Sequence, residues 1–305
     1  MNQTQDLLAT LQSQYPLPFR GVQPLREVGG TAFAVHGGGR WVLKLARPAF
    51  QDTFRQGVDV MLYLAERGFP VPKIVPTKDG QPRFTYEGRC AVLFEYIEGK
   101  EPKRRGNEGR IGELVGQLHA LMREYPGPLK ERGKAYFVGR YLEQLRQKDT
   151  PSHILEQFER MGDALWARAE RLPRGYCHGD MHIGNLLQTR QGGLYALDFD
   201  ASCRAFPLYD VAVMCDTTDY FGFDAKGYGR SARSFARFLE GYEKHRPLSE
   251  AERMAFFDCV ALRHYRLQAT ILELFGLDCV DGAFVERQLD WLLRWREQCN
   301  MNKGR

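Results

Sequence analysis

The chain has 305 residues, 43% of them hydrophobic and 12% aromatic, which excludes a disordered or fibrous protein and leaves room for two lobes or domains. It contains no run of 18 or more apolar residues, so we expect no membrane-spanning segment. The net charge of +5 is modest, and the dense basic run over residues 100–110 is interpreted as a solvated loop, so no nucleic-acid partner is expected.

Residues 1–19 lack the cationic start and apolar stretch of a signal peptide. They are predicted to form a short amphipathic helix with Leu7, Leu8 and Leu11 on one face. The seven cysteines are scattered and include no Cys-x-x-Cys pair, so neither a zinc site nor a disulfide framework is predicted. These observations favour a cytoplasmic protein.

Residues 24–98 are predicted to be rich in strands. An apolar stretch over 28–35 is broken by two glycines, a glycine turn follows, and residues 41–46 form the next strand of a hairpin. A helix is predicted over 54–67, because apolar residues recur there at helical spacing. A small antiparallel sheet is completed by three short strands, over 74–75, 82–86 and 90–96.

Beyond residue 99 the pattern changes to helices, interrupted by one strand-and-loop block over 175–210. Ser249 followed by Glu252 has the pattern of a capping box, which predicts the start of a helix. The order of elements predicts an α+β protein with two lobes, a small antiparallel β-rich N-lobe over residues 1–98 and a larger helical C-lobe over 99–305. Helices are predicted over residues 111–123, 141–147, 154–171, 211–219, 232–245, 250–275 and 285–298.

The strongest chemical signal lies in the strand-and-loop block. Asp180, in a His-Gly-Asp sequence, is followed five positions later by Asn185, after which an apolar strand begins. A polar turn leads to a second short strand, which ends at Asp198. Phosphoryl transfer needs one carboxylate to orient the attacking hydroxyl and take its proton, and carboxylate and amide oxygens to hold Mg²⁺ against the phosphates. Asp180 is therefore the candidate base, and Asn185 and Asp198 are the candidate metal ligands.

Two features of the N-lobe fit a nucleotide site. Gly29, Gly30 and Thr31 lie between two strand segments, where small residues let backbone N–H groups approach phosphates closely. Lys44 lies in the middle of an apolar strand, which is unusual for a lysine unless its ammonium has a partner.

The motifs at 178–185 (His-Gly-Asp-x-x-x-x-Asn), 197–200 (Leu-Asp-Phe-Asp) and 209–212 (Tyr-Asp-Val-Ala) resemble those of the aminoglycoside phosphotransferase and choline kinase superfamily. Within it the chain is most similar to type II homoserine kinases and bacterial spore-coat kinase-like proteins, over residues 28–295. The resemblance implies a protein-kinase-like fold with ATP between its lobes. It also implies transfer of the γ-phosphate, with Mg²⁺, to a hydroxyl group of a small molecule.

The resemblance also implies the roles of individual residues. Lys44 and the loop over 29–31 would contact the phosphates of ATP. The segment over 93–99 resembles the hinge where adenine pairs with main-chain groups, here those of Glu95 and Ile97. Asp210 would bond the backbone of the catalytic loop from the start of its helix.

One departure from the superfamily concerns the helix after the Lys44 strand. The superfamily places on it a Glu that pairs with the lysine, and the corresponding position falls near Gly57 or Val58. Asp59 is shorter than Glu and points away from the expected face, since each helical residue turns the side chain by about 100°. We therefore expect Lys44 to find its partner in the ATP phosphates or in Asp198.

The acceptor is predicted only as a class, an amino alcohol or a hydroxy amino acid, with an aminoglycoside or other antibiotic as the alternative. A non-catalytic nucleotide-binding or coat-type protein is the alternative of another class. A protein kinase is disfavoured, because the short segment between Asp198 and Asp210 leaves little room for a peptide-docking loop. The oligomeric state stays open. Contacts to the acceptor are predicted for Asp200, His182, Asp216 and Arg263, with Arg266 as a further candidate partner of a substrate carboxylate.

Overall fold

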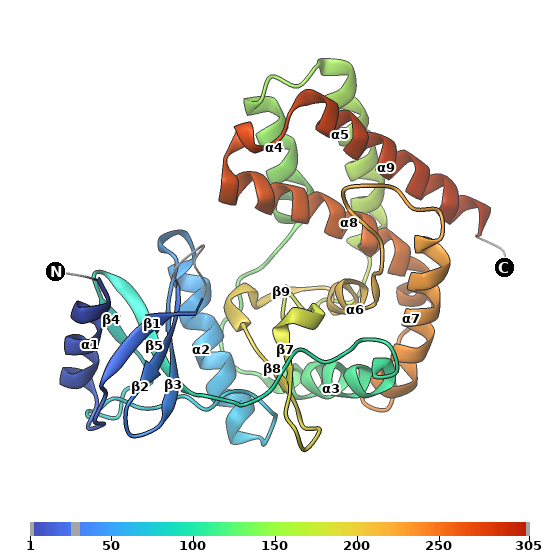
Figure 1. Ribbon diagram of the computed structural model, residues 1–305. Helices are drawn as coiled ribbons and strands as arrows, with labels where there is room; N and C mark the ends of the chain where they lie inside the picture. The colour runs from blue at the N-terminus through green and yellow to red at the C-terminus, as the bar shows by residue number, and fades with distance from the viewer. Residues whose placement is uncertain (1–2, 26–30, 303–305) are drawn as a thin grey trace. The chain divides into compact units, whose positions relative to one another are not determined.

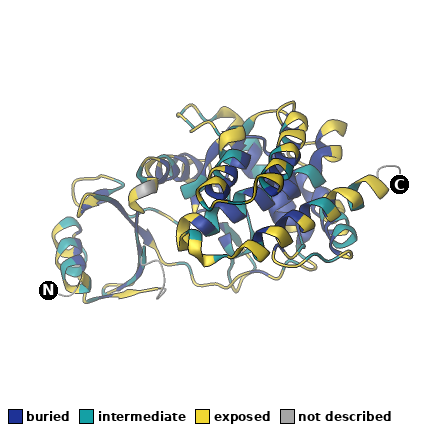
Figure 2. Ribbon diagram, turned by 90° about the horizontal axis from the view of Figure 1, so that it is seen from above, coloured by how far each residue is buried: buried dark blue, intermediate teal, exposed yellow. Residues whose placement is uncertain are grey.

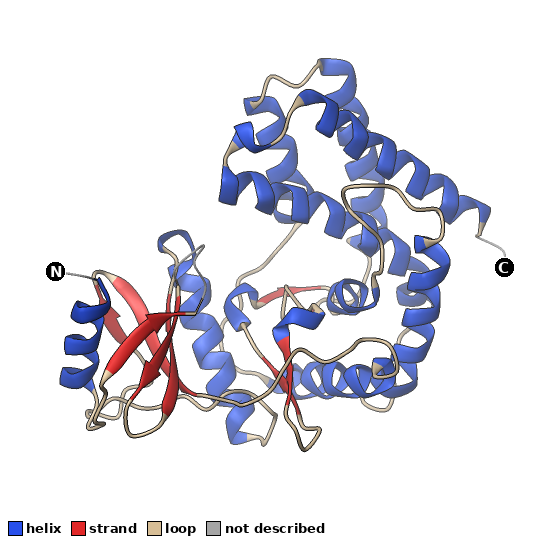
Figure 3. Cartoon of the chain, viewed as in Figure 1, coloured by secondary structure: helices blue, strands red, loops and turns tan. Residues whose placement is uncertain are grey.

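The computed structural model describes residues 3–25 and 31–302, and the chain divides into two compact units. Strands are concentrated in the first and helices in the second (Figure 1 and Figure 3). The presence of a five-stranded antiparallel sheet and of a larger helical part confirms the expected α+β class. Unit 1 comprises Met1–Pro102, Tyr125–Leu129 and Ile183–Ser202, and unit 2 comprises Lys103–Glu124, Lys130–His182 and Cys203–Arg305.

The sheet of unit 1 has the strand order β1-β2-β3-β5-β4, with every neighbouring pair antiparallel. Alternate side chains of its strands point to one face, where they form an apolar core with Leu7 and Leu11 of α1 (Gln3–Gln14). The amphipathic N-terminal helix expected from the sequence is therefore present. The strands are β1 (Gly21–Pro24), β2 (Ala32–His36), β3 (Arg40–Leu45), β4 (Phe84–Tyr86) and β5 (Arg89–Glu95).

Helix α2 (Gln51–Glu66) follows a 3-10 turn, η1 (Pro48–Phe50). Figure 1 shows α1 and α2 on opposite sides of the sheet. The strand expected over 74–75 is not formed, and Ile74 makes only an isolated bridge to Phe94. The flanking Pro72 and Pro76 explain this, because proline has no N–H to donate to a sheet.

A short hairpin completes unit 1. Strands β7 (Leu186–Gln188) and β8 (Leu194–Ala196) pair antiparallel, as the sequence predicts. The hairpin is joined to the rest of the unit by the Ala196 N–H, which donates to Pro70 O at 3.0 Å, and by a bridge between Lys100 and Gln188. It is preceded by the 3-10 turn η4 (Ile183–Asn185) and followed by a second one, η5 (Phe199–Ala201).

Unit 2 is helical apart from one two-stranded ladder, formed by β6 (Gly175–Cys177) and β9 (Cys203–Ala205). Buried residues line its helices where these pack together (Figure 2). The capping box predicted at Ser249 and Glu252 is present, and the helix it starts spans 26 residues. The main helices are α3 (Glu108–Leu121), α4 (Arg140–Gln147), α5 (Ser152–Ala169), α6 (Leu208–Cys215), α7 (Gly227–Tyr242), α8 (Glu250–Phe275) and α9 (Gly282–Met301).

Shorter turns connect these helices, namely the 3-10 turns η2 (Met122–Glu124) and η6 (Leu277–Cys279) and a π-helical turn, η3 (Ala135–Gly139). Helices α3 and α7 approach each other through glycines, because a Cβ at Gly112 would lie 2.0 Å from Phe238 O and one at Gly241 would lie 1.8 Å from Gly109 O. None of the described helices combines the length and apolar character needed to cross a bilayer.

Candidate active site

Lys44 lies on the face of β3 that is opposite to the apolar core of unit 1. Its neighbours Leu43 and Leu45 belong to that core, so the alternation of a strand turns Lys44 to the other face. There its Nζ lies 2.7 Å from Oδ1 of Asp198 and 2.7 Å from Oδ1 of Asp200. Only 18% of the lysine side chain is exposed, so two carboxylates compensate a largely buried ammonium.

Asp198 and Asp200 belong to the tight turn after β8. Asp198 has a left-handed backbone, with φ 60° and ψ 65°, which costs an L-residue about 1–2 kcal/mol and is best tolerated by Asn and Asp. The η5 turn then brings Asp200 to the same lysine. The Leu197 N–H donates to Asn185 O at 2.9 Å, so the two predicted metal ligands come from adjoining ends of one hairpin.

The three charges shift one another's ionisation. Burial lowers the pKa of the Lys44 ammonium, but the charges of Asp198 and Asp200 outweigh this and its pKa rises. Burial raises the pKa of Asp200 to about 6, with Lys44 opposing the shift and the neighbouring Asp198 carboxylate adding to it. The lysine is therefore firmly protonated at neutral pH.

Of the predicted phosphate loop, Thr31 is described, and Gly29 and Gly30 lie outside the described residues. Thr31 O accepts a hydrogen bond from the Leu45 N–H at 2.7 Å. The first residue of β2 is the register partner of Lys44. The loop therefore leads directly into the strand beside the lysine.

Glu95 and Ile97 lie at and just beyond the end of β5. The Glu95 N–H donates to Lys73 O at 2.9 Å. Pairing of this residue with adenine would consequently use its carbonyl oxygen rather than its N–H. Ile97 is half-buried in the segment that follows.

Helix α2 packs on the η5 turn through its backbone. A Cβ at Gly57 would lie 2.5 Å from Phe199 O, closer than a side chain allows. Asp59 does not reach the lysine, because its Oδ1 lies 2.6 Å from Nη1 of Arg83. Lys44 therefore takes both partners from the turn after β8, and Asp198 is the one expected from the sequence.

In unit 2, the loop that carries Asp180 begins where β6 ends. The carboxylate of Asp210, near the start of α6, accepts hydrogen bonds from His178 N at 2.6 Å and Gly179 N at 2.9 Å. Its Oδ2 also lies 3.1 Å from Nε2 of His119, and the whole side chain is buried. The expected role of Asp210 in holding the loop backbone is confirmed.

Within unit 2, Arg266 and His182 lie beside Asp180. Its Oδ1 lies 3.2 Å from Nη1 of Arg266, and its Oδ2 lies 3.5 Å from Nε2 of His182. Arg266 is itself held by the hydroxyls of Tyr136 and Tyr209, at 3.2 and 3.4 Å. Burial raises the pKa of Asp180, but the His182 hydrogen bond and the Arg266 charge outweigh it, so the pKa lies below its usual range.

Asp216 and Arg263, both predicted acceptor contacts, belong to an internal network of unit 2. Asp216 is buried, and its carboxylate accepts hydrogen bonds from Thr218 N at 2.9 Å and from the Tyr220 hydroxyl. Arg263 Nη1 lies 3.5 Å from Asp216 Oδ2 and donates to Val213 O at 2.8 Å. These contacts give both residues partners within the protein.

Two contacts were not foreseen from the sequence. Asp200 pairs with Lys44, for which the only signal was a second acid two positions after Asp198. Arg266 pairs with Asp180 across 86 residues of sequence, and nothing in the local pattern of either residue predicts this. Both unforeseen contacts involve a predicted site residue.

Asn185 and Asp198 fit a divalent cation as part of a ligand set. In the part of the chain that the structure describes, no group of three or more His, Cys, Asp or Glu side chains is arranged to hold a metal ion. Mg²⁺ at nucleotide sites takes one or two protein carboxylates and completes its shell with phosphate and water oxygens. One carboxylate and one amide, at adjoining ends of a hairpin, fit that pattern.

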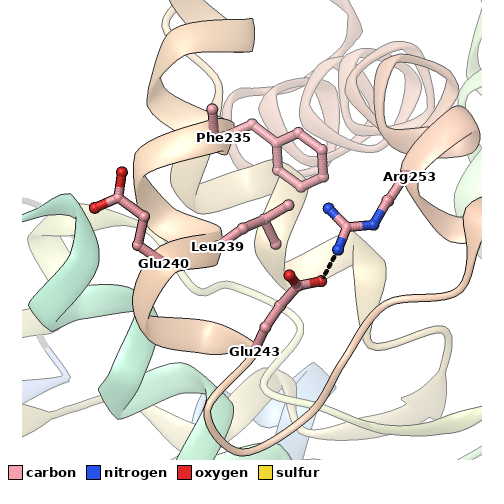
Figure 4. A pocket seen from close by; sticks show the side chains of 6 residues that line it. Phe235, Leu239, Glu240, Glu243 and Arg253 are labelled. Carbon is pink, nitrogen blue, oxygen red and sulfur yellow. Dashed lines mark hydrogen bonds and ion pairs between the residues drawn. The ribbon is translucent and has the colours of Figure 1, made fainter.

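A surface groove of about 390 Å³ lies in unit 2 beside α7 (Figure 4). Phe235 and Leu239 of α7 form its apolar wall, and Glu243 pairs with Arg253 of α8 at its edge. The residues that line it include none of the predicted site residues.

The model of the phosphotransferase enzyme family matches residues 22–248, more than half of the chain. The chain belongs to this family. A homoserine kinase of Rhodopseudomonas palustris (strain BisA53) is 29% identical to this phosphotransferase over 256 residues, which cover 78% of the chain and 74% of the relative. The expectation of a small-molecule kinase of the aminoglycoside phosphotransferase and choline kinase superfamily is thereby confirmed.

Solved structures show the same fold. An amicoumacin kinase, hAmiN, solved in complex with AMP-PNP, Ca²⁺ and Ami, has a TM-score of 0.73 to this phosphotransferase at 17% identity, covering 99% of the chain and 94% of that protein. A microcompartment-associated aminopropanol kinase has a TM-score of 0.72 at 19% identity, covering 96% of the chain and 95% of that protein. At these identities the likeness concerns the fold alone.

Proposed function

We propose that this phosphotransferase uses ATP and Mg²⁺ to phosphorylate the hydroxyl group of a hydroxy amino acid. The observation that carries the proposal is the pair of charge clusters built around predicted site residues. In unit 1, Lys44 is held by two carboxylates. In unit 2, Asp180 is held ionised by Arg266 and His182.

The residues of unit 1 suit the nucleotide. The Lys44 ammonium would neutralise phosphate oxygens, and backbone N–H groups of the loop that ends at Thr31 would approach them. The carbonyl oxygen of Glu95 and the main chain of Ile97 would pair with the adenine edge. Positioning and charge neutralisation of this kind supply most of the catalysis in phosphoryl transfer.

Asn185 and Asp198 would hold Mg²⁺. The chemistry supplied by the bound metal would be partial neutralisation of the phosphate charge that the attacking hydroxyl meets. Asp198 is suited to this because its left-handed backbone fixes the carboxylate at the end of β8. Such a strained residue is maintained only where the surrounding structure holds it in place.

Asp180 would orient the acceptor hydroxyl. Its lowered pKa makes it a weak base before the reaction begins. In the loose transition state of phosphoryl transfer the nucleophile needs orientation more than early deprotonation. Asp180 would therefore accept a hydrogen bond from the hydroxyl first and its proton late.

The acceptor class rests on the charge beside Asp180. Arg266 offers a guanidinium, and guanidinium groups bind carboxylates through paired hydrogen bonds. A hydroxy amino acid carries the required hydroxyl and carboxylate in one small molecule. The homoserine kinase relative supports the same class.

The test is a panel assay of ADP release by the purified protein with Mg-ATP. The panel contains homoserine, other hydroxy amino acids, aminopropanol, choline and aminoglycosides. We expect turnover with a hydroxy amino acid and its loss, by about 100-fold or more, in Asp180→Asn, since general-base catalysis contributes about this much. ATP affinity should be nearly unchanged in this variant.

Other results would correct the proposal in defined ways. Turnover only with aminopropanol or choline would replace the acceptor class by an amino alcohol. Turnover only with an aminoglycoside would assign an antibiotic. The protein and its Asp180→Asn variant could both bind ATP and show no turnover with any member of the panel. That result would favour a non-catalytic nucleotide-binding protein.

A further inference from the structure

The Lys44 ammonium is shared by two acids of one turn. Its Nζ lies at the same distance, 2.7 Å, from Asp198 and from Asp200. A largely buried ammonium that loses its partners is strongly disfavoured. Without nucleotide phosphates, the position of Lys44 therefore depends on these acids.

Helix α2, the element that packs beside this turn, supplies no acid to the lysine. Gly57 faces the turn, and its backbone lies so close to Phe199 that no side chain fits there. The acids of the helix have other partners. They are engaged by arginines, in the pairs Asp52 with Arg55 at 3.5 Å, Asp59 with Arg83 at 2.6 Å and Glu66 with Arg67 at 3.7 Å.

The helix instead fixes the turn. Gln56, beside Gly57, donates from its Nε2 to Ser202 O at 2.6 Å. The close approach at Gly57 involves Phe199, and this hydrogen bond involves Ser202. The helix therefore contacts the turn both before and after Asp200 in the sequence. The helix thus positions Asp200 through contacts with the backbone of the turn, and Asp200 in turn reaches Lys44.

Under the proposed function Asp198 has a second task, because it holds the metal. A carboxylate bound to Mg²⁺ attracts the lysine ammonium less strongly, because the cation neutralises part of its negative charge. We propose that Asp200 is the positioning carboxylate of Lys44, holding the ammonium in place while Asp198 holds the metal. This inference rests on the proposed function for the role of Asp198, and on the structure for the contact between Asp200 and Lys44.

The contact is tested first by a double-variant cycle on stability, which needs no activity. Thermal unfolding is measured for the unsubstituted protein, Asp200→Asn, Lys44→Met and the double variant. Because Asp200 acts on Lys44, we expect the melting temperature of the double variant to fall by clearly less than the sum of the two single shifts. The control is Asp59→Asn, whose acid pairs with Arg83, and its shift should add fully to that of Lys44→Met.

The role is tested by steady-state kinetics with the acceptor found by the panel. Asp200→Asn should raise the KM for ATP by about 10-fold, as expected for loss of one charge-assisted contact. In a Lys44→Met background the same change should have little further effect. Asp198→Asn should remain damaging in that background, because its metal contact does not depend on the lysine.

Two results would overturn the inference. One is full additivity of Asp200→Asn and Lys44→Met in both stability and kinetics, which would mean that Asp200 acts on its own, for example on the metal. The other is an Asp200→Asn protein with unchanged melting temperature and KM for ATP.

If Asp200→Asn does not fold, Asp200→Glu replaces it, and a KM for ATP that does not depend on Lys44 would again oppose the inference. A protein without turnover on the whole panel would remove the proposed function, while the stability cycle would still decide the contact.

Discussion

The residues of the candidate site differ in how they are held. Lys44 and Asp180 each lie next to charges of opposite sign, so their ionisation is set by neighbours rather than by solvent. Asp198 pairs with Lys44 and also has a left-handed backbone conformation at the end of a strand. Substitutions at these positions should therefore have different and separable effects.

Replacing Asp198 should remove the metal dependence of nucleotide binding. In Asp198→Ala we expect the affinity for ATP with Mg²⁺ to fall by about 10-fold or more and to become equal to the affinity without it, since a ligand to the metal is lost. Titration calorimetry with and without Mg²⁺ measures this. Lys44→Ala serves as the comparison, because it should weaken ATP binding under both conditions. An Mg²⁺ effect that persists in Asp198→Ala would assign the metal to other residues.

Replacing Arg266 should change the pH dependence of turnover. The Arg266 charge helps to keep the pKa of Asp180 low, so Arg266→Met should raise that pKa. A base must be ionised to accept a proton, and the acid limb of the kcat/KM profile should therefore move to higher pH. The control is Arg168→Met, which removes a guanidinium paired with Asp258. If the acid limb stays in place in Arg266→Met, the ionisation that limits turnover at low pH belongs to a group other than Asp180.

The sequence was informative about residues whose chemistry depends on local spacing. The interval between Asp180 and Asn185, and the strand that ends at Asp198, sufficed to predict both parts of the hairpin. The pairing of Arg266 with Asp180 joins distant segments and has no local pattern. Long-range contacts of this kind depend on how helices pack, which a single sequence does not reveal.

At the scale of elements, glycines set the distances between packed segments. Helix α2 rests on the η5 turn at Gly57, and α3 rests on α7 at Gly112 and Gly116. A glycine inside a helix normally weakens it by about 0.5–1 kcal/mol relative to alanine. At these positions the lack of a side chain allows the backbones of the two segments to come into close contact.

The prediction at this scale is that Gly57→Ala destabilises the protein, against the usual helical trend. The new Cβ would lie 2.5 Å from Phe199 O, so either the helix or the turn has to move. We expect a loss of about 1–3 kcal/mol in the free energy of unfolding, the usual cost of overpacking, together with weaker ATP binding. Denaturant unfolding monitored by circular dichroism measures the stability.

The matched control is Gly109→Ala in α3. There the nearest atom to the new Cβ is Arg237 O at 3.5 Å, an ordinary contact. This variant should be neutral or more stable by up to about 1 kcal/mol. Equal effects of the two substitutions would show that the approach of α2 to the turn is not tight in solution.

Helices were easier to predict than strands. The longest helix, α8, begins and ends at the predicted residues, because a capping box marks its start. Strand β1 was missed, since its Gly21–Pro24 segment carries glycine and proline that normally indicate a turn. The expected strand at 74–75 is prevented by the flanking prolines, which have no N–H to donate to a sheet.

At the scale of the whole molecule, each compact unit is assembled from three separate segments of the chain. The turn that holds Lys44 comes from Ile183–Ser202, far in sequence from the sheet that carries the lysine. A fragment that ends at Pro102 would therefore lack both carboxylates of Lys44. The two predicted lobes describe the order of elements along the chain, and the compact units describe which segments pack together.

The protein should lose stability in mild acid because of a histidine buried in unit 2. His264 stacks on Trp291, with 4.4 Å between ring centroids, and burial lowers its pKa to about 3, with the neighbouring Gln288 side chain opposing the shift. The unfolded chain takes up this proton below about pH 6.5, and the folded chain does not until about pH 3. Stability is therefore present above pH 6.5 and falls as the pH drops through this window, by about 2 kcal/mol at pH 5.

Denaturant unfolding between pH 7.5 and 5, followed by tryptophan fluorescence, measures this effect. His264→Gln should flatten the dependence on pH, since glutamine has no proton to gain. The exposed His153 provides the control, and His153→Gln should leave the slope unchanged. An unchanged slope in His264→Gln would mean that the acid sensitivity comes from other groups, such as the buried His119, whose pKa burial also lowers.

The contact of Asp210 with the loop that carries Asp180 has a consequence for slow motions. The N–H groups of His178 and Gly179 both donate to a carboxylate that is wholly buried, so neither amide can meet solvent while the loop stays in place. Amide hydrogen exchange at these two positions requires the loop to leave the start of α6. Their exchange rates, compared with those of the α8 interior, would therefore report how often Asp180 is released from the geometry in which it could act.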